Sequence, residues 1–162
     1  MLNLNIKFCF KLIFIISLIS IISAYFIEYI LGHQPCNLCI IERIPYILSI
    51  FLIITNYIFK KNEKFIIILL ALIFVFSFLI SVYHFGIEQG FFEESAVCSL
   101  KNAAEIISKE EILKLFSEKN ISCKDVTFRV FGLSLTTINI LISLGIIILL
   151  IKIYTIYAKI KY

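Results

Sequence analysis

The stretch FIIILLALIFVFSFLISVYHFGI, residues 65–87, decides the fold of this chain. It contains no Lys, Arg, Asp or Glu. Its length is enough to cross a bilayer, which takes about 20 apolar residues in a helix. A lone segment in hydrocarbon has to be helical, because only a helix satisfies its own backbone polar groups. Residues 65–87 are therefore predicted to form a transmembrane helix.

Three further apolar runs are long enough to span a membrane, at residues 12–31, 41–59 and 131–151. Of the 162 residues, 61% are hydrophobic and 16% are charged, and the mean hydropathy is +1.04. A soluble domain would have about half its residues apolar and about a quarter charged. The sequence predicts an all-α integral membrane protein, a four-helix bundle in one domain over residues 1–162. Its long outer loop is expected at residues 88–130.

Charge predicts the orientation of the four helices. The N-terminus, residues 60–64 and the C-terminal tail together hold eight of the 15 basic residues and one of the 11 acidic residues. The positive-inside rule places these segments, and both termini, in the cytoplasm and the cysteine-bearing loops outside. The net charge of +4 is thus explained by topology, and no nucleic-acid partner is expected. A cleaved signal peptide is the alternative for residues 12–31, but that run is longer than a usual signal core.

Four of the five cysteines fall in the predicted outer loops. Cys36 and Cys39 form a Cys-x-x-Cys in the short loop, and Cys98 and Cys123 lie in the long loop. Outside the cytoplasm such thiols tend to be oxidised, and four cysteines allow three pairings among which the sequence does not choose. A disulfide within Cys-x-x-Cys closes a small ring that constrains the unfolded chain little. That favours a redox role for the pair over a bracing one.

Two structural alternatives stand beside the redox reading. A Cys98–Cys123 bridge could be purely structural, and four sulfurs could hold zinc in a tetrahedral site. Zinc is disfavoured because Cys98 and Cys123 are not a second close pair and because an oxidising compartment favours disulfides. No metal is therefore predicted. Cys9, alone at the cytoplasmic end, is expected to be an inert thiol.

Arg43 and His84 are polar residues on the same side of the predicted membrane as the cysteine loops. If the second helix begins near Cys39, Arg43 lies one turn further on the same face. Its guanidinium would favour the thiolate of Cys39 and can hydrogen-bond a carbonyl oxygen of a bound ring. The alternative is that Arg43 anchors the helix at the interface or pairs with Glu42. His84 and Glu88 have the same spacing at the outer end of the third helix, where ordinary polar helix ends are the alternative.

The long outer loop contains one helix signal. Ser108 and Glu111 have the spacing of a capping box, and the residues that follow, 112–116, are apolar on one side. Asn120 is a reasonable helix stop. We expect a short amphipathic helix lying in the lipid headgroups, with a partner-binding helix as the alternative.

Several segments, taken in order, resemble the disulfide bond formation protein B (DsbB) family. They are PCNLCIIER at residues 35–43, YHFGIEQG at 83–90, CS at 98–99, SCKDV at 122–126 and RVFGLS at 129–134. Each motif alone is weak, whereas the ordered set covers nearly the whole chain. Family members often carry tryptophan in these motifs. This chain has none, and Phe91, Phe92 and Phe128 stand in the aromatic places.

The resemblance implies a thiol:quinone oxidoreductase of the bacterial inner membrane. Such an enzyme reoxidises a periplasmic thioredoxin-like oxidase of the DsbA type and passes the electrons to ubiquinone or menaquinone. By resemblance, the partner attacks Cys98, Cys123 passes the exchange to Cys36, and Cys39 donates to the quinone. Arg43 and His84 are the residues expected at the quinone by the same resemblance. The alternatives are a non-catalytic membrane scaffold with structural disulfides and an unrelated four-helix quinone reductase.

The predicted topology can be tested by labelling thiols in intact cells. After mild reduction, a membrane-impermeant maleimide should label Cys36 and Cys98, because both loops are expected outside the cytoplasm. Cys9 should label only after the cells are permeabilised. Labelling of Cys36 and Cys98 from opposite sides of the membrane would rule out any exchange between the two pairs.

Overall fold

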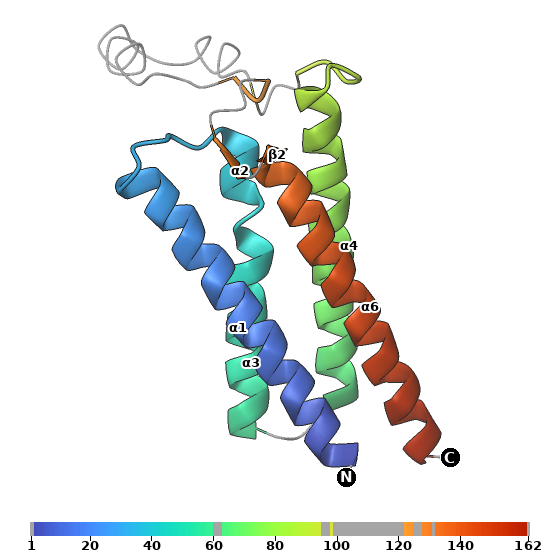
Figure 1. Ribbon diagram of the computed structural model, residues 1–162. Coiled ribbons are helices and arrows are strands. Elements are labelled where there is room, and N and C mark those ends of the chain that lie inside the picture. The colour runs from blue at the N-terminus through green and yellow to red at the C-terminus, as the bar shows by residue number, and fades with distance from the viewer. Residues whose placement is uncertain are drawn as a thin grey trace, which may run out of the picture.

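The computed structural model describes residues 2–59, 63–94, 98, 122–124, 128–130 and 132–161. Within these residues four helical stretches are long and apolar enough to cross a membrane: Ile6–Tyr29, Asn37–Ile58, Glu63–Glu88 and Leu135–Tyr157. They lie side by side (Figure 1), which confirms the predicted all-α four-helix membrane fold. The amphipathic helix expected near residues 108–119 lies outside the described residues.

The described chain runs through five helices and a small hairpin. The helices are α1 (Leu2–Tyr29), α2 (Asn37–Ile41), α3 (Ile44–Phe59), α4 (Glu63–Glu88) and α6 (Leu135–Lys161), with strands β1 (Arg129–Val130) and β2 (Leu133–Ser134) before α6. α4 packs along α6, α1 packs along α3, and α3 also contacts α4. The start of α1 and the end of α6 lie at the same end of the bundle, while α2 and β2 lie at the other (Figure 1).

The sequence had suggested that the second span is one continuous helix, but the structure divides it into α2 and α3. α2 ends at Ile41, the chain turns at Glu42 and Arg43, and α3 begins at Ile44. Pro45 explains the break, because it has no N–H to donate to the carbonyl of Ile41 and its ring crowds that carbonyl. In the first turn of a new helix the missing N–H costs nothing. Arg43 therefore lies in the turn that follows the helix carrying Cys39, and not in that helix itself.

The last helix starts at Leu135 instead of Phe131. The preceding residues form the antiparallel β1–β2 pair, and Gly132, with φ of +83°, supplies the left-handed backbone at the reversal. The Oγ of Ser134 then accepts a hydrogen bond from the backbone N–H of Thr137 at 3.2 Å. This is the bond of a helix N-cap, and it fixes where α6 begins.

Interior packing combines apolar side chains with small hydroxyls. The fully buried apolar residues include Ile13, Ile53, Ile67, Leu70, Phe74, Ile146 and Leu150. Ser17 of α1 hydrogen-bonds Ser49 of α3 at 2.8 Å, and Ser77 of α4 hydrogen-bonds Ser143 of α6 at 3.2 Å. Small polar residues let membrane helices approach closely and bond across the interface. One of these bonds lies in the α1–α3 interface, and the other lies in the α4–α6 interface.

Phe74 and Phe76 give a matched test of this packing. Phe74 is fully buried and Phe76 is 58% exposed on the lipid-facing surface. We expect Phe74→Ala to lower the free energy of unfolding by about 2 kcal/mol. This is less than the same substitution costs in the core of a soluble protein, because in a membrane protein the side chain stays in an apolar solvent in both states. Phe76→Ala should change it little. Unfolding in mixed detergent micelles, followed by circular dichroism, measures both, and equal losses would contradict the assigned interior.

Candidate functional site: the cysteine cluster

The four outer-loop cysteines meet at one end of the bundle. Cys98 and Cys123 form a disulfide with a Cα–Cα distance of 5.7 Å. Together with Cys36 they belong to one buried cluster that also contains Leu38 and Ile87, and Cys39 packs against it. Of the three pairings left open by the sequence, the structure agrees with the one that joins Cys98 to Cys123, while Cys36 and Cys39 are free thiols. It brings the long-loop bridge directly beside the Cys-x-x-Cys.

Local backbone structure sets the geometry of the Cys-x-x-Cys. Cys36 is the N-cap of α2, and its Sγ accepts a hydrogen bond from the backbone N–H of Cys39 at 3.4 Å. This folds the two side chains together, so that their Sγ atoms lie 3.0 Å apart as free thiols. Little movement is needed to close a disulfide between them.

A metal ion is the alternative use of these sulfurs. Cys36, Cys39 and His84 each offer a ligand atom, and these atoms lie within 4.8 Å of one another. Two sulfurs on one tetrahedral zinc, at bonds of about 2.3 Å, would lie about 3.8 Å apart. The observed 3.0 Å is shorter, so the pair is better arranged for a disulfide than for zinc.

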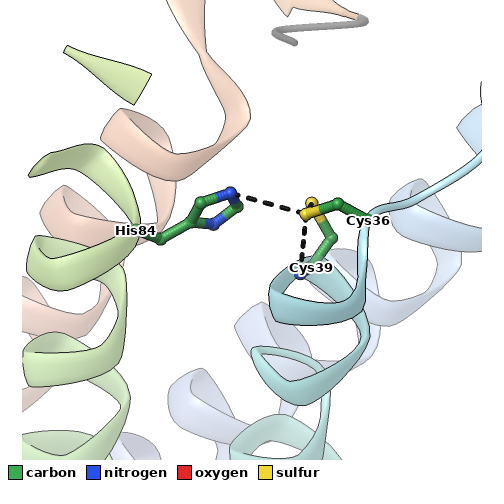
Figure 2. A group of neighbouring side chains, drawn as sticks. All are labelled: Cys36, Cys39 and His84. Atoms are coloured by element: carbon green, nitrogen blue, oxygen red, sulfur yellow. Dashed lines mark hydrogen bonds between the residues drawn. The ribbon is translucent and has the colours of Figure 1, made fainter. Parts of the chain in front are cut away.

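His84 reaches the cysteines from α4. Its ring is 2% exposed, and its Nε2 lies 3.5 Å from the Sγ of Cys36 (Figure 2). Its other nitrogen, Nδ1, lies 3.0 Å from Oε1 of Glu42. Glu88, one turn along α4, has Oε1 at 4.0 Å from Nε2 and accepts a hydrogen bond from Thr136 at 2.5 Å. The imidazole is therefore held between a thiol and carboxylates in a buried setting.

Glu42 is a site residue that sequence reasoning missed, since it had been considered only as a partner for Arg43. Its Oε2 accepts a hydrogen bond from Nδ2 of Asn139 at 3.0 Å. Nδ2 of Asn139 also bonds Ser81 at 2.7 Å, and its Oδ1 accepts from the hydroxyl of Tyr46. The available signal was Asn139 itself, because a lone amide in an apolar span is costly and tends to have a role.

Arg43 takes its partners from α1. Its Nη1 donates to Oε2 of Glu28 at 2.5 Å, and its guanidinium carbon lies 5.1 Å from the ring centre of Tyr25. Among the described side chains its ion-pair partner is thus Glu28, so the alternative pairing with Glu42 is wrong. The guanidinium is only partly exposed, and the carboxylate balances its charge where lipid solvation is poor.

A cavity of about 330 Å³ lies beside these groups. Cys39, Glu42 and Arg43 line its polar part, and Ile19, Ile138 and Ile142 belong to its apolar walls. Apolar walls with a few placed polar groups are typical of a small-molecule site. A flat apolar ring with carbonyl oxygens fits this combination. His84 lies outside the lining and connects to it through Glu42.

The outer end of α4 also packs on the cluster. Tyr83 contacts the cysteine cluster and stacks on Phe92, with ring centres 5.7 Å apart. Phe92 in turn lies so close to Gly86 that a Cβ at Gly86 would overlap its ring. The absence of a side chain at this position lets the chain after α4 fold back over the helix end.

The electrostatic setting favours the thiolate of Cys36. The hydrogen bond from the Cys39 thiol and the nearby His84 outweigh the opposing effect of burial, and they lower the pKa of the Cys36 thiol to about 4. A thiolate is the nucleophilic form of cysteine. The Cys36 thiol therefore ionises more readily than an ordinary cysteine thiol.

These features define a class: a multi-pass membrane protein in which a Cys-x-x-Cys packs against a second cysteine pair. The chain belongs to the family described as Disulfide bond formation protein DsbB, which it matches over residues 6–153. It is similar to Uncharacterized protein RP370 of Rickettsia prowazekii (strain Madrid E), at 33% identity over 137 residues, or 83% of this chain and 80% of that protein. No solved structure matches it significantly.

The lowered pKa of Cys36 predicts a pH dependence. Because the pKa lies at about 4, the reduced protein should retain ultraviolet thiolate absorbance at about pH 6 and lose it only as the pH falls toward 4. Cys36→Ser should abolish this acid-stable absorbance, whereas Cys9→Ser should leave it. A thiolate signal that appears only above about pH 8, as for an ordinary cysteine, would contradict the assignment.

Proposed function

We propose that this protein reoxidises a periplasmic thioredoxin-like oxidase of the DsbA type and passes the electrons to ubiquinone or menaquinone. One observation carries the proposal: Cys39 lies 3.0 Å, sulfur to sulfur, from Cys36 and also lines the cavity. A single sulfur thus belongs both to the disulfide-exchange cluster and to the site suited to an electron acceptor. Family membership supports the same reading.

The proposed exchange follows the contacts in the cluster. A thiolate of the partner attacks Cys98, and Cys123 leaves as a thiolate. Cys123 then attacks Cys36 of an oxidised Cys36–Cys39 pair, which frees Cys39. Each step forms one S–S bond and breaks another, so it needs access and a good leaving thiolate. The burial of Cys36 and Cys123 in one cluster supports the transfer between the two pairs.

The partner's second thiolate completes its own disulfide and releases Cys98. Cys98 then restores its bond to Cys123, which leaves Cys36 and Cys39 reduced, the form seen in the structure. The two electrons taken from the partner now reside on the pair beside the cavity. Closing the Cys36–Cys39 disulfide releases them and returns the protein to its starting state.

The cavity residues fit a quinone. When bound, a quinone supplies an acceptor for two electrons and two protons. Arg43 is positioned on the cavity wall to hydrogen-bond a carbonyl oxygen, and its pairing with Glu28 keeps it there. Cys39 lines the same cavity. His84 does not line it but hydrogen-bonds Glu42, which does. The apolar walls exclude water and suit a lipid-soluble ring.

The membrane and its sidedness are part of the proposal. The basic residues at both chain ends and at residues 60–64 support cytoplasmic termini. The cysteine cluster lies at the opposite end of the bundle from the start of α1 and the end of α6 (Figure 1). We therefore propose that the cluster lies at the periplasmic face of a bacterial inner membrane, where a soluble oxidase meets it.

A structural scaffold accounts for less of the site. Such a protein needs the Cys98–Cys123 bridge and nothing more. It gives no reason for two free thiols 3.0 Å apart, for a buried histidine beside them or for an adjoining cavity. The enzyme reading explains all of these together.

The decisive test is quinone reduction by the purified protein. With a reduced thioredoxin-like dithiol and soluble ubiquinone or menaquinone analogues, we expect loss of the quinone absorbance band. Cys39→Ser should abolish the activity, because the sulfur facing the cavity is lost, while circular dichroism and the Cys98–Cys123 disulfide stay unchanged. Cys9→Ser is the matched control and should keep full activity. No quinone loss with the unmodified protein and either quinone would overturn the proposal.

A further inference from the structure

We propose that Cys36, His84 and Glu42 form a nucleophile–base–carboxylate triad whose carboxylate end leads the Cys36 proton to the cavity. His84 is the base that touches the reacting sulfur, and Glu42 is the residue that positions it. The identity of the electron acceptor in this inference rests on the proposed function. The triad itself rests on contacts that need no ligand.

The geometry has the order of a triad. Nε2 of His84 lies 3.5 Å from the Cys36 sulfur, and Nδ1 lies 3.0 Å from Glu42. In Figure 2 the imidazole extends from α4 toward the sulfur of Cys36. A nucleophile, a base within hydrogen-bonding reach and a third group orienting the base are the signature of an activated nucleophile. Cys36 and Glu42 cap the two ends of α2 and His84 comes from α4, so spacing along the chain did not reveal the contact.

The carboxylate determines the state of the imidazole. An ionised carboxylate only accepts hydrogen bonds, so Glu42 selects the tautomer with its proton on Nδ1. Nε2 is then free to take the proton of the Cys36 thiol, and Glu42 stabilises the imidazolium that results. Without the negative charge of Glu42, the charged pair of thiolate and imidazolium would be costly in this buried setting.

Glu42 itself is held in place and borders the cavity. Asn139 donates to its second oxygen at 3.0 Å, so both oxygens of the carboxylate are engaged. Glu42 is 8% exposed and belongs to the cavity lining, whereas His84 does not. The proton of a buried thiol therefore has a continuous hydrogen-bonded route, from Cys36 through His84 to Glu42, that ends at the cavity.

The balance of the step follows from this route. When the reduced pair closes, one S–S bond forms between Cys36 and Cys39, the protons of both cysteines are given up, and two electrons pass with two protons to the acceptor. In the reduced pair the Cys36 proton already resides on Nε2 of His84, as an imidazolium beside Glu42. Once the negative charge of Cys36 has been consumed in the S–S bond, the imidazolium releases its Nδ1 proton by way of Glu42 into the cavity. The Cys39 proton enters the cavity directly from its own sulfur. A quinone takes up both electrons and both protons, so no other reactant is required.

Other charged groups near the triad belong to the same few elements. Among the described residues, the titratable groups that face Cys36 or His84, apart from the triad, are Cys39 of α2 and Glu88 and Tyr83 of α4. α6 contributes Thr136 and Asn139 there, which do not titrate. Cys98 and Cys123 are bonded to each other. A pH profile of Cys36 thus reports on this limited set.

The test measures the alkylation rate of Cys36 against pH in detergent-purified protein free of quinone. A Cys39→Ser background leaves Cys36 without a disulfide partner in the motif, and mass spectrometry identifies the alkylated peptide. We expect Glu42→Gln to raise the midpoint of the profile by about one pH unit, which slows alkylation about tenfold below the midpoint. Glu42→Asp, which keeps the charge, should restore part of the shift.

Glu63→Gln is the matched control, because Glu63 lies at the opposite end of α4, and it should leave the profile unchanged. A Glu42→Gln profile that superimposes on the control would sink the triad. If Glu42→Gln fails to fold, judged by circular dichroism, His84→Gln gives the same comparison. Since neither quinone nor partner protein is present, a shift supports the triad even where the quinone assay fails, and no shift refutes it even where that assay succeeds.

Discussion

The hydrogen bond between His84 and Glu42 is the contact on which the cysteine-bearing end of the bundle depends. It joins α4 to the turn between α2 and α3 in a region where lipid cannot solvate polar groups. Each group has further partners: Cys36 for the histidine and Asn139 for the carboxylate. Individual bonds of this kind contribute about 0.6 kcal/mol on average in membrane proteins. Their larger effect is geometric, because a half-satisfied network would be worse than none.

This network also explains why the two ends of the bundle differ. At the end of the bundle where α1 starts and α6 finishes, Ile, Leu and Phe side chains pack the four long helices together. Paired serines lie between these helices. Toward the cysteines, the interior holds His84, Glu42 and Asn139. Ionisable residues inside a membrane protein are rare, and they mark functional regions. The polar end adjoins the cysteine cluster and the cavity, so the costly groups gather where chemistry is proposed.

Sequence reasoning found the fold because hydrophobic length is a direct signal. Residues 65–87 have to cross the bilayer, and no tertiary information is needed to see it. Reasoning was weaker where a local signal competed with a regional one. Pro45 divides the second span and Ser134 delays the start of α6, although hydropathy runs on through both. Pro45 and Ser134 are local helix signals, but the predicted helix boundaries followed the apolar runs that continue through both residues.

The candidate site was only half predictable. Cysteine spacing pointed to Cys36 and Cys39, and the resemblance of the motifs pointed to Arg43 and His84. The pairing of Arg43 with Glu28 and the role of Glu42 between histidine and cavity were not foreseen. Those contacts depend on how helices rotate and on the break before α3, and side-chain partners across helices are not encoded by spacing along one of them. Family membership supports the general chemistry but does not describe these contacts.

The bare backbone at Gly86 has a consequence for how this protein tolerates change. The ring of Phe92 occupies the space that any side chain there would need, and the same ring leans on Tyr83, a neighbour of the sulfurs. The displacement caused by adding one methyl group would thus be transmitted through two aromatic rings to the cysteine cluster. A position that carries no reactive atom is in this way coupled to the packing around the cysteines.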